Sequence, residues 1–239
     1  MIGPAPSGAA HTRGPPGLMM PPCTDLAMLD RHATIWIRPV IDPLARRLAR
    51  AGIGADALTV TGWAVGWTAA GLIALGAPGW GAAAIVLSRG CDALDGAVAR
   101  LNGPTDRGGF LDITLDFLFY AAIPLGFAVA DPARNALAAA VLLAAFVGTG
   151  TSFLAFAAIA ARRGLANTTA PNKALHYLGG LTEGTETLAG FLAMCLWPRH
   201  FAALAYGFAI LCAITIATRV HAGWRRFAPA PAAAPRDRA

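Results

Sequence analysis

The sequence predicts an all-α, polytopic integral membrane protein, with six transmembrane helices preceded by an N-terminal amphipathic helix in the membrane interface. Composition is the first reason, because 56% of the 239 residues are hydrophobic and only 13% are charged, whereas soluble domains carry roughly 25% charged residues. The second reason is a series of apolar runs that reach the roughly 20 residues an α-helix needs to cross the hydrocarbon core. The third is a set of arginines that gathers in alternate loops.

Six apolar runs define the predicted spans. They extend over residues 57–76, 80–100, 108–130, 135–161, 178–196 and 201–219. Turn residues or charged residues separate each run from the next, which favours a chain that returns through the membrane after every span. The fourth run is longer than a straight span requires, so we expect that helix to tilt or to project from the membrane.

The chain outside these runs divides into tails and one interfacial segment. Residues 1–24 are rich in Pro, Gly and Ala, which predicts a disordered tail, and they lack the apolar core of a signal peptide. Residues 25–56 mix apolar residues with arginines, so we expect an amphipathic helix that is kinked or divided at its two prolines. The transmembrane domain then covers residues 57–222, and a C-terminal tail covers residues 223–239.

Positive charge predicts the orientation in the membrane. The basic residues of one set of loops and flanks are Arg46, Arg47, Arg50, Arg100, Arg107, Arg162, Arg163, Lys173, Arg219, Arg225 and Arg226. The opposite loops hold only Arg134 and Arg199. By the positive-inside rule, both termini are cytoplasmic, in a membrane of the bacterial inner or cytoplasmic type. The net charge of +6 therefore indicates topology and contact with membrane lipids, with no nucleic-acid partner.

Four aspartates interrupt the second and third apolar runs. Asp92 and Asp95 lie one helical turn apart on the second run, and Asp112 and Asp116 lie one turn apart on the third. A turn signal at residues 102–104 separates the two runs, so we expect an antiparallel hairpin. In such a hairpin Asp92 faces Asp116 and Asp95 faces Asp112, at a shallow depth of roughly 8 Å from the cytoplasmic helix ends.

Such a cluster indicates a metal site. An acidic side chain in an apolar span is costly and marks a functional site by default, and four neighbouring carboxylates cannot all stay ionised without cations. Carboxylates together with substrate phosphates are the usual ligands of Mg²⁺, and a pair of such ions can clamp both the attacking and the leaving oxygen of a phosphoryl displacement. Arg89, three residues deeper than Asp92, needs an acidic or phosphate partner there.

The residues around the aspartates resemble the signature D-x2-D-G-x2-A-R-x8-G-x3-D-x3-D of the CDP-alcohol phosphatidyltransferases. The matching positions are Asp92, Asp95, Gly96, Ala99, Arg100, Gly108, Asp112 and Asp116. One departure exists, because only seven residues separate Arg100 from Gly108. The missing residue falls in the turn between the two spans, where loop length is tolerated. The six spans and the preceding interfacial helix also look like the family.

The resemblance implies an enzyme and its chemistry. A phosphatidyl group passes from a CDP-linked lipid, usually CDP-diacylglycerol, to an alcohol, and CMP leaves. Asp92, Asp95, Asp112 and Asp116 would be the ligands of Mg²⁺ or Mn²⁺, as a site for two ions, and Asp116 would also be the general base for the acceptor hydroxyl. The resemblance also implies a homodimer. It leaves the acceptor open among glycerol phosphate, inositol phosphate, serine and other alcohols.

Four further residues of the signature would bind the donor. Gly96 and Ala99 are small and share nearly the same helix face as Asp92, which leaves room for a ligand, although close helix packing explains small residues equally well. Arg100 at the mouth of the site is suited to a phosphate. In the family pattern these three residues would accommodate and orient the cytidine nucleotide, and Gly108 would allow a close approach at the start of the third span.

Polar residues before and in the fifth span are candidates for the acceptor pocket. Lys173 and His176 are suited to an acceptor phosphate, although a solvated loop explains them as well. Glu183 and Glu186 lie one turn apart and would line the pocket, the alternative being compensation of the helix dipole. A different class of function, a cation or proton transporter, would use the four aspartates as a relay. Against it, the acids all lie toward one side of the membrane, and Mg²⁺-dependent release of CMP would decide between the two.

Overall fold

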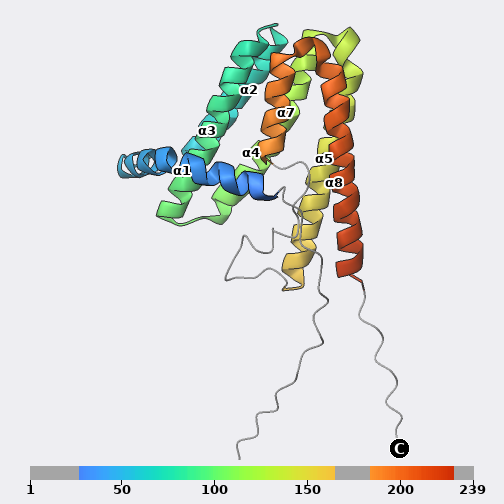
Figure 1. The fold of residues 1–239 in the computed structure, drawn as a ribbon. Coiled ribbons are helices and arrows are strands. Elements are labelled where there is room, and N and C mark those ends of the chain that lie inside the picture. The colour runs from blue at the N-terminus through green and yellow to red at the C-terminus, as the bar shows by residue number, and fades with distance from the viewer. Residues whose placement is uncertain (1–26, 165–183, 229–239) are drawn as a thin grey trace, which may run out of the picture.

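The computed structural model describes residues 27–164 and 184–228, and within these two ranges the chain is helical without any strand. In chain order, the elements are α1 (Ala27–Arg50), α2 (Ala55–Ala74), α3 (Pro78–Asn102), α4 (Asp106–Ala130), α5 (Pro132–Arg162), α7 (Gly184–Leu196), the 3-10 turn η2 (Pro198–His200) and α8 (Phe201–Arg226). Figure 1 shows these helices arranged as a bundle, with α1 outside it. The helix bounds agree with the first four predicted runs to within a few residues, α7 ends with the fifth run, whose first residues lie outside the described chain, and α8 extends beyond the sixth run to Arg226.

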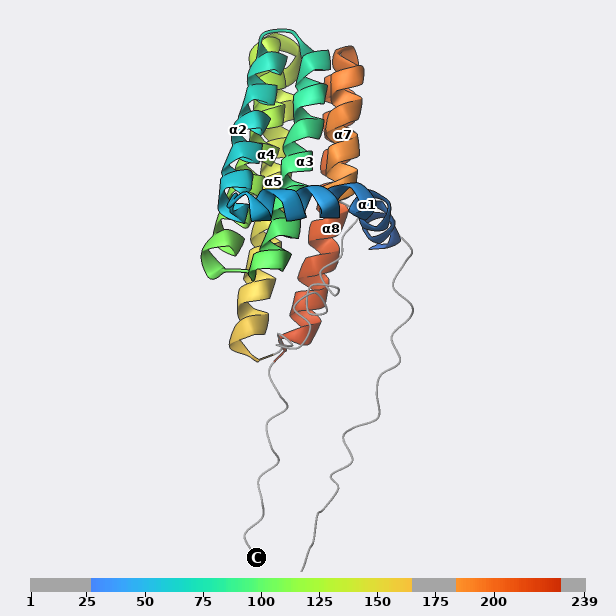
Figure 2. The same ribbon diagram turned by 90° about the vertical axis from the view of Figure 1, so that its left-hand side faces the viewer.

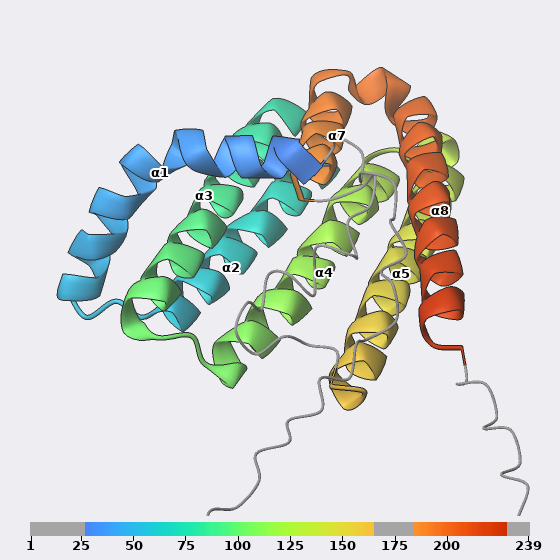
Figure 3. The same ribbon diagram turned by 60° about the horizontal axis from the view of Figure 1, so that its bottom comes forward.

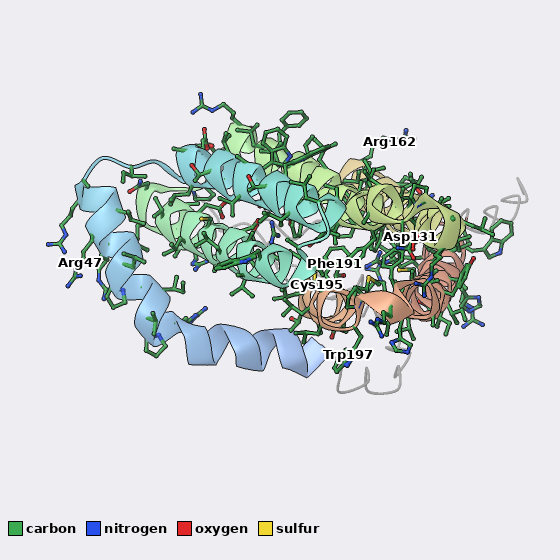
Figure 4. All side chains as sticks on the ribbon, turned by 90° about the horizontal axis from the view of Figure 1, so that it is seen from above. Arg47, Asp131, Arg162, Phe191, Cys195 and Trp197 are labelled. Atoms are coloured by element: carbon green, nitrogen blue, oxygen red, sulfur yellow. The ribbon has the colours of Figure 1, made fainter. Side chains whose placement is uncertain are left out.

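Helices α2 and α5 each pack along two other helices of the bundle. Helix α2 packs along both α3 and α4, while α5 packs along α4 and α8, and α7 contacts α3 and α8. Helix α1 lies across α3 (Figure 2). It bends along its length (Figure 3), and from above it curves round the outside of the bundle (Figure 4). Pro39 and Pro43 both lie inside this helix, and a proline that removes a helix hydrogen bond is a usual cause of such a bend.

Small residues and aromatic rings hold the bundle together. Gly126 of α4 lies so close to α2 that a Cβ atom added there would be 2.6 Å from the Ala70 carbonyl oxygen. Glycine at such a crossing lets two helix backbones approach closely, as in many membrane bundles. The centre of the core is a group of buried aromatic rings. The ring centroid of Phe191 on α7 lies 5.9 Å from that of Phe119 on α4 and 6.0 Å from that of Phe146 on α5.

The helices have the lengths and apolarity of membrane spans. Four stretches of the described chain are long and apolar enough to cross a membrane, namely Ala55–Ala74, Asp106–Ala130, Pro132–Arg162 and Pro198–Arg226. Helix α3 is as long as α4, at 25 residues, but carries the charged residues of the site. Helix α7 covers 13 apolar residues. An all-helical membrane protein is therefore confirmed, while the number of six spans stays a prediction.

The two ends of the bundle differ in which loops they hold. Arg163, after α5, donates a hydrogen bond of 2.9 Å to the carbonyl oxygen of Phe227, after α8, so the C-terminal ends of these helices are neighbours. At the other end, Arg134 donates a bond of 3.4 Å to the Arg199 carbonyl oxygen. The connection between α3 and α4 lies at the same end as the C-terminal ends of α5 and α8 (Figure 1). The arginines that flank that connection and those at the C-terminal ends of α5 and α8 are therefore found at one end of the described bundle.

Candidate active site

Helix α2 fixes the position of α3 beside the acidic residues. The buried hydroxyl of Ser88 on α3 donates a hydrogen bond of 2.7 Å to the carbonyl oxygen of Gly62 on α2. A Cβ atom on Gly62 would lie only 2.9 Å from the Cβ atom of Cys91. The two helices therefore meet one residue before Asp92, and this contact leaves little freedom for the α3 backbone at the site.

Three of the four aspartates meet across the space between α3 and α4. Asp92, Asp112 and Asp116 each offer a carboxylate oxygen, and these atoms all lie within 4.8 Å of one another. Asp92 and Asp116 are half-buried, and Asp112 is exposed. Asp95 is not a member of this group. Its side chain is buried, at 6% exposure, and it lines a narrow space together with Asp92 and Asp116.

Arg89 lies directly against the carboxylates. Its Nη1 atom is 2.7 Å from Oδ1 of Asp116 and 3.4 Å from Oδ1 of Asp92. Its guanidinium group also covers the ring of Phe119, 4.2 Å from the ring centroid. The sequence indicated only that this arginine needs an acidic or phosphate partner. The structure supplies two aspartates and an aromatic face, and these contacts come from two different helices.

The arrangement suits a divalent cation. Carboxylate oxygens are the ligands preferred by Mg²⁺ and Mn²⁺, and three of them converge here from two helices. The Oδ2 atom of Asp95 is buried and has no hydrogen-bond partner among the described residues, and such an atom usually requires one. Only Arg89 forms an ion pair with the cluster within the described chain. One guanidinium against four carboxylates leaves room for further positive charge.

A large cavity opens beside the cluster at the arginine-rich end. Its volume is about 580 Å³, and it lies between the start of α2, the end of α3 and the start of α4. Five residues that the sequence singled out line it, namely Asp95, Gly96, Ala99, Gly108 and Asp112. Space of this size next to a group of carboxylates is suited to a nucleotide whose phosphates approach a bound metal.

The two glycines of this cavity have different surroundings. Among the described residues, a Cβ atom on Gly96 would meet the Nη1 atom of Arg100, at 3.4 Å, and no other atom within 4 Å. Gly108 opens α4, where its amide donates a bond of 3.0 Å to the hydroxyl of Thr105. A Cβ atom on Gly108 would lie 3.3 Å from a carboxylate oxygen of Asp56. Gly96 thus leaves space in the cavity, whereas Gly108 lies where the first turn of α4 has close neighbours in Thr105 and Asp56.

Arg100 lies at the border of two spaces. It is not among the residues that line the large cavity, and it lines a neighbouring one of about 250 Å³ together with Arg38, Asp42 and Arg46 of α1. Its Nη1 atom nevertheless points toward Gly96, close enough to touch a Cβ atom built there. The guanidinium group is therefore next to the large cavity without forming its wall.

A second cavity lies on the other side of the cluster. It has a volume of about 280 Å³, and its wall combines Asp112, Asp116 and Tyr120 of α4 with residues of α5, α7 and α8. Asp112 lines both cavities, so the two spaces meet at the aspartates. A site with one chamber on each side of a carboxylate cluster can hold two substrates and bring their reacting atoms together there.

Arg219 is a wall residue of the second cavity that the sequence did not single out. By sequence it is one of the loop arginines that predict topology. In the structure it lies on α8, donates a hydrogen bond of 3.1 Å to the carbonyl oxygen of Thr149 on α5, and has its guanidinium 5.7 Å from the ring centroid of Phe153. The only sequence signal was its place at the very end of an apolar run, where a basic residue is ordinary.

The predicted acceptor residues divide into two groups. Lys173, His176 and Glu183 lie outside the described residues. Glu186 lies in the first turn of α7 and is half-buried. It is not among the residues that line the second cavity, although Gly184 and Thr187 on either side of it are.

Comparison with known proteins gives the family. Residues 53–217 match the family model of the CDP-alcohol phosphatidyltransferases. The inner membrane protein YnjF of Escherichia coli is 51% identical over 200 residues, which cover 82% of this chain and 96% of the relative. The phosphatidylinositol phosphate synthase of Mycobacteroides abscessus is 33% identical over 196 residues, which cover 77% and 83% of the two chains.

Solved structures of a phosphatidylinositol phosphate synthase have a fold similar to that of this chain. The crystal structure of Mycobacterium tuberculosis phosphatidylinositol phosphate synthase with CDP-DAG bound superposes with a TM-score of 0.58 at 25% identity, over 78% of this chain and 94% of the other. The complex of the same enzyme with manganese and citrate gives a TM-score of 0.57 at 25% identity, over 77% and 89%.

The chain therefore belongs to the CDP-alcohol phosphatidyltransferase family. It is an enzyme of phospholipid biosynthesis that transfers a substituted phosphate group from a CDP-linked lipid to an alcohol and releases CMP. The family and reaction class predicted from the aspartate signature are confirmed. This membership decides against the alternative prediction of a cation or proton transporter.

Proposed function

We propose that this enzyme transfers the phosphatidyl group of CDP-diacylglycerol to a small alcohol where its two cavities meet. One observation carries the proposal. The carboxylates of Asp92, Asp112 and Asp116 converge within 4.8 Å at the border between a cavity of nucleotide size and a smaller one. The donor is supported by the Mycobacterium tuberculosis relative, which binds CDP-DAG.

The aspartates serve as the metal ligands in this proposal. Asp92, Asp95, Asp112 and Asp116 hold two ions of Mg²⁺ or Mn²⁺, and the manganese complex of the Mycobacterium tuberculosis enzyme supports a divalent metal. When bound, the ions neutralise the pyrophosphate oxygens of the donor and stabilise the charge on the departing CMP. The buried Oδ2 atom of Asp95 has no hydrogen-bond partner in the described part of the chain, which supports its place among the ligands.

Asp116 acts as the general base. It lines the second cavity but not the first, so it reaches the acceptor and not the nucleotide. The proton of the acceptor hydroxyl moves to a carboxylate oxygen of Asp116 while the hydroxyl oxygen bonds to the phosphorus that carries diacylglycerol. The bond between that phosphorus and the bridging oxygen of the pyrophosphate breaks. CMP leaves with the bridging oxygen and needs no proton from an acid.

The donor side uses the small residues of the signature. Gly96, Ala99 and Gly108 line the larger cavity, and there they leave room for the cytidine nucleotide. Arg100 turns its guanidinium toward a donor phosphate from the edge of that cavity. The proximity of its Nη1 atom to Gly96 supports this role.

The second cavity receives the acceptor. A cation in its wall, Arg219, favours an alcohol that carries a phosphate, such as glycerol phosphate or inositol phosphate, over serine. Two curated relatives carry the name phosphatidylinositol phosphate synthase, which is consistent with this choice. Lys173, His176 and Glu183, which precede α7, and Glu186, in its first turn, remain predicted contributors.

The membrane arrangement completes the proposal. Helices α3 and α7 cross the membrane with the four apolar stretches, which makes six spans over a domain of residues 57–222. Helix α1 lies in the cytoplasmic interface. Its Ala45 packs against Ala97 and Val98 of α3, close to the carboxylates, and this contact supports a position of α1 at the depth of the active site. Both termini and the active site are then cytoplasmic, on the side of the arginine-rich loops. The homodimer stays a prediction from the family resemblance.

A reconstituted assay tests the reaction. The purified protein in lipid nanodiscs receives CDP-diacylglycerol, Mg²⁺ and one acceptor at a time, with CMP measured continuously and the lipid product identified by mass spectrometry. We expect CMP release with a phosphorylated acceptor, loss of release in excess chelator, and recovery with Mg²⁺ or Mn²⁺. Full turnover in chelator would refute the metal role, and absence of CMP release with every acceptor would refute the proposed reaction.

A further inference from the structure

Arg89 is a charged residue of the site that lies outside the signature motif, three positions before its first aspartate. Its side chain is 16% exposed, and its Nη1 atom contacts one oxygen each of Asp116 and Asp92, at 2.7 Å and 3.4 Å. These two aspartates belong to the three whose oxygens converge. A permanently charged guanidinium group is therefore in direct contact with two of the carboxylates that would hold the metal.

The position of this guanidinium does not depend on the carboxylates alone. Phe119 supports one face at 4.2 Å, and the Nη2 atom lies 3.5 Å from the hydroxyl oxygen of Ser88. Ser88 in turn donates its proton to Gly62 of α2. Residues of three helices thus contribute to the position of the arginine beside the cluster.

A guanidinium and a metal ion compete for the same lone pairs. Each carboxylate oxygen offers about two acceptor positions. Arg89 uses one of them on Asp116 through a hydrogen bond of 2.7 Å and forms an ion pair with Asp92 at 3.4 Å. Two neighbouring cations also repel each other, even at the high effective dielectric constant near a protein surface. The same contact also has an ordering effect, because a carboxylate that accepts a charged hydrogen bond has fewer accessible orientations than a free one.

We propose that Arg89 is a built-in counter-cation that orients Asp116 for its work as the base while it weakens metal binding at Asp92 and Asp116. The inference rests on the proposed function of Asp116. It makes Arg89 a positioning residue, because the guanidinium acts through the carboxylate and not on the substrate.

The proposal predicts opposite effects of one substitution. In Arg89→Met, the oxygens that the arginine occupied become free and its repulsion disappears, so Mn²⁺ should bind at least about fivefold more tightly. The turnover number at saturating metal should nevertheless fall by about 10- to 100-fold, because the base loses its orientation. A purely structural arginine would lower both quantities together. The KM for CDP-diacylglycerol should stay within about twofold, because Arg89 does not line the donor cavity.

Conservative and control variants separate charge from geometry. Arg89→Lys keeps the charge but has no planar fork, so Mn²⁺ affinity should stay near that of the natural protein while turnover falls in part. Arg89→Gln removes the charge with a polar side chain and serves as a second neutral variant. Arg134→Met removes one exposed arginine at the opposite end of the bundle and should change neither quantity.

The experiment measures free Mn²⁺ by electron paramagnetic resonance in nanodiscs without substrate, together with steady-state CMP release and the thermal midpoint. Tighter Mn²⁺ binding with slower turnover in the neutral variants supports the inference. Weaker or unchanged Mn²⁺ binding at an unchanged thermal midpoint overturns it. If neither neutral variant folds, Arg89→Lys decides, because unimpaired turnover would refute the orienting role. The Mn²⁺ measurement does not depend on catalysis, so failure of the proposed reaction would be seen separately.

Discussion

Replacing Asp116 by Asn separates its role as the base from binding of the donor. The amide has nearly the shape of the carboxylate but cannot take the acceptor proton. Arg89 keeps an acidic partner, because Asp92 lies 3.4 Å from its Nη1 atom, so the substitution leaves no buried charge unpaired. We therefore expect a folded enzyme in which, once Mg²⁺ is saturating, turnover is impaired and donor binding is largely kept.

The size of the effect follows from the role. A positioned general base contributes roughly 10²- to 10⁴-fold, which corresponds to about 2.7 to 5.5 kcal/mol of activation free energy. Asp116 lines the second cavity and not the larger one, so equilibrium binding of CDP-diacylglycerol should change by less than about threefold. Asp95→Asn is the matched comparison, because Asp95 lines the larger cavity and its loss should weaken donor binding as well as turnover.

The assay combines donor binding and CMP release for both variants at saturating Mg²⁺. Asp131→Asn, at the opposite end of the bundle, controls for the chemical change itself and should behave like the natural protein. If Asp116→Asn keeps more than about a tenth of the turnover number, Asp116 is not the base. Glu183, which the sequence also offers on this side, would then be the next residue to test.

Three further substitutions test the orientation, the packing and the donor cavity. A cysteine at Thr105, in a protein without its four native cysteines, should react with an impermeant reagent from the cytoplasmic side only, and reaction from outside would reverse the proposed topology. Gly126→Ala places a Cβ atom 2.6 Å from a backbone oxygen of α2 and should lower the free energy of unfolding by about 1 to 3 kcal/mol, which a lower thermal midpoint would show. Gly207→Ala, where an added Cβ atom has no described atom within 4 Å, should not lower the midpoint. Equal midpoints for the two variants would contradict the close contact. Gly96→Leu extends into the larger cavity and should raise the KM for CDP-diacylglycerol severalfold in a folded protein, and an unchanged KM would place the nucleotide elsewhere.

The sequence predicted much of the site because the helix is periodic. Aspartates three and four residues apart share a helix face, and a turn near residue 104 brings the two faces together at a matching height. This reasoning predicted that Asp92 faces Asp116, and both belong to the group within 4.8 Å. It also predicted Asp95 beside Asp112, and these two residues line one cavity. The arithmetic needs only a rise per residue and a turn position, and both are local properties.

Contacts between distant helices were beyond that reasoning. Arg219 lies more than 100 residues after Asp112, yet both line the second cavity, because α5 packs on both α4 and α8. Apolar periodicity shows which residues face a neighbour and does not show which helix the neighbour is. The same limit applies to Arg89, for which the sequence indicated the need for a partner but not the choice of Asp116.

The geometry of the acidic cluster depends on a helix that contributes none of its carboxylates. Helix α2 packs along both α3 and α4, with Gly62 against Cys91 on one side and Gly126 against Ala70 on the other. The separation of the aspartates on α3 from those on α4 is therefore determined by how closely α2 approaches each helix. Because metal coordination tolerates only small changes in ligand position, we expect the close packing at these glycines to be needed for metal binding by the aspartates.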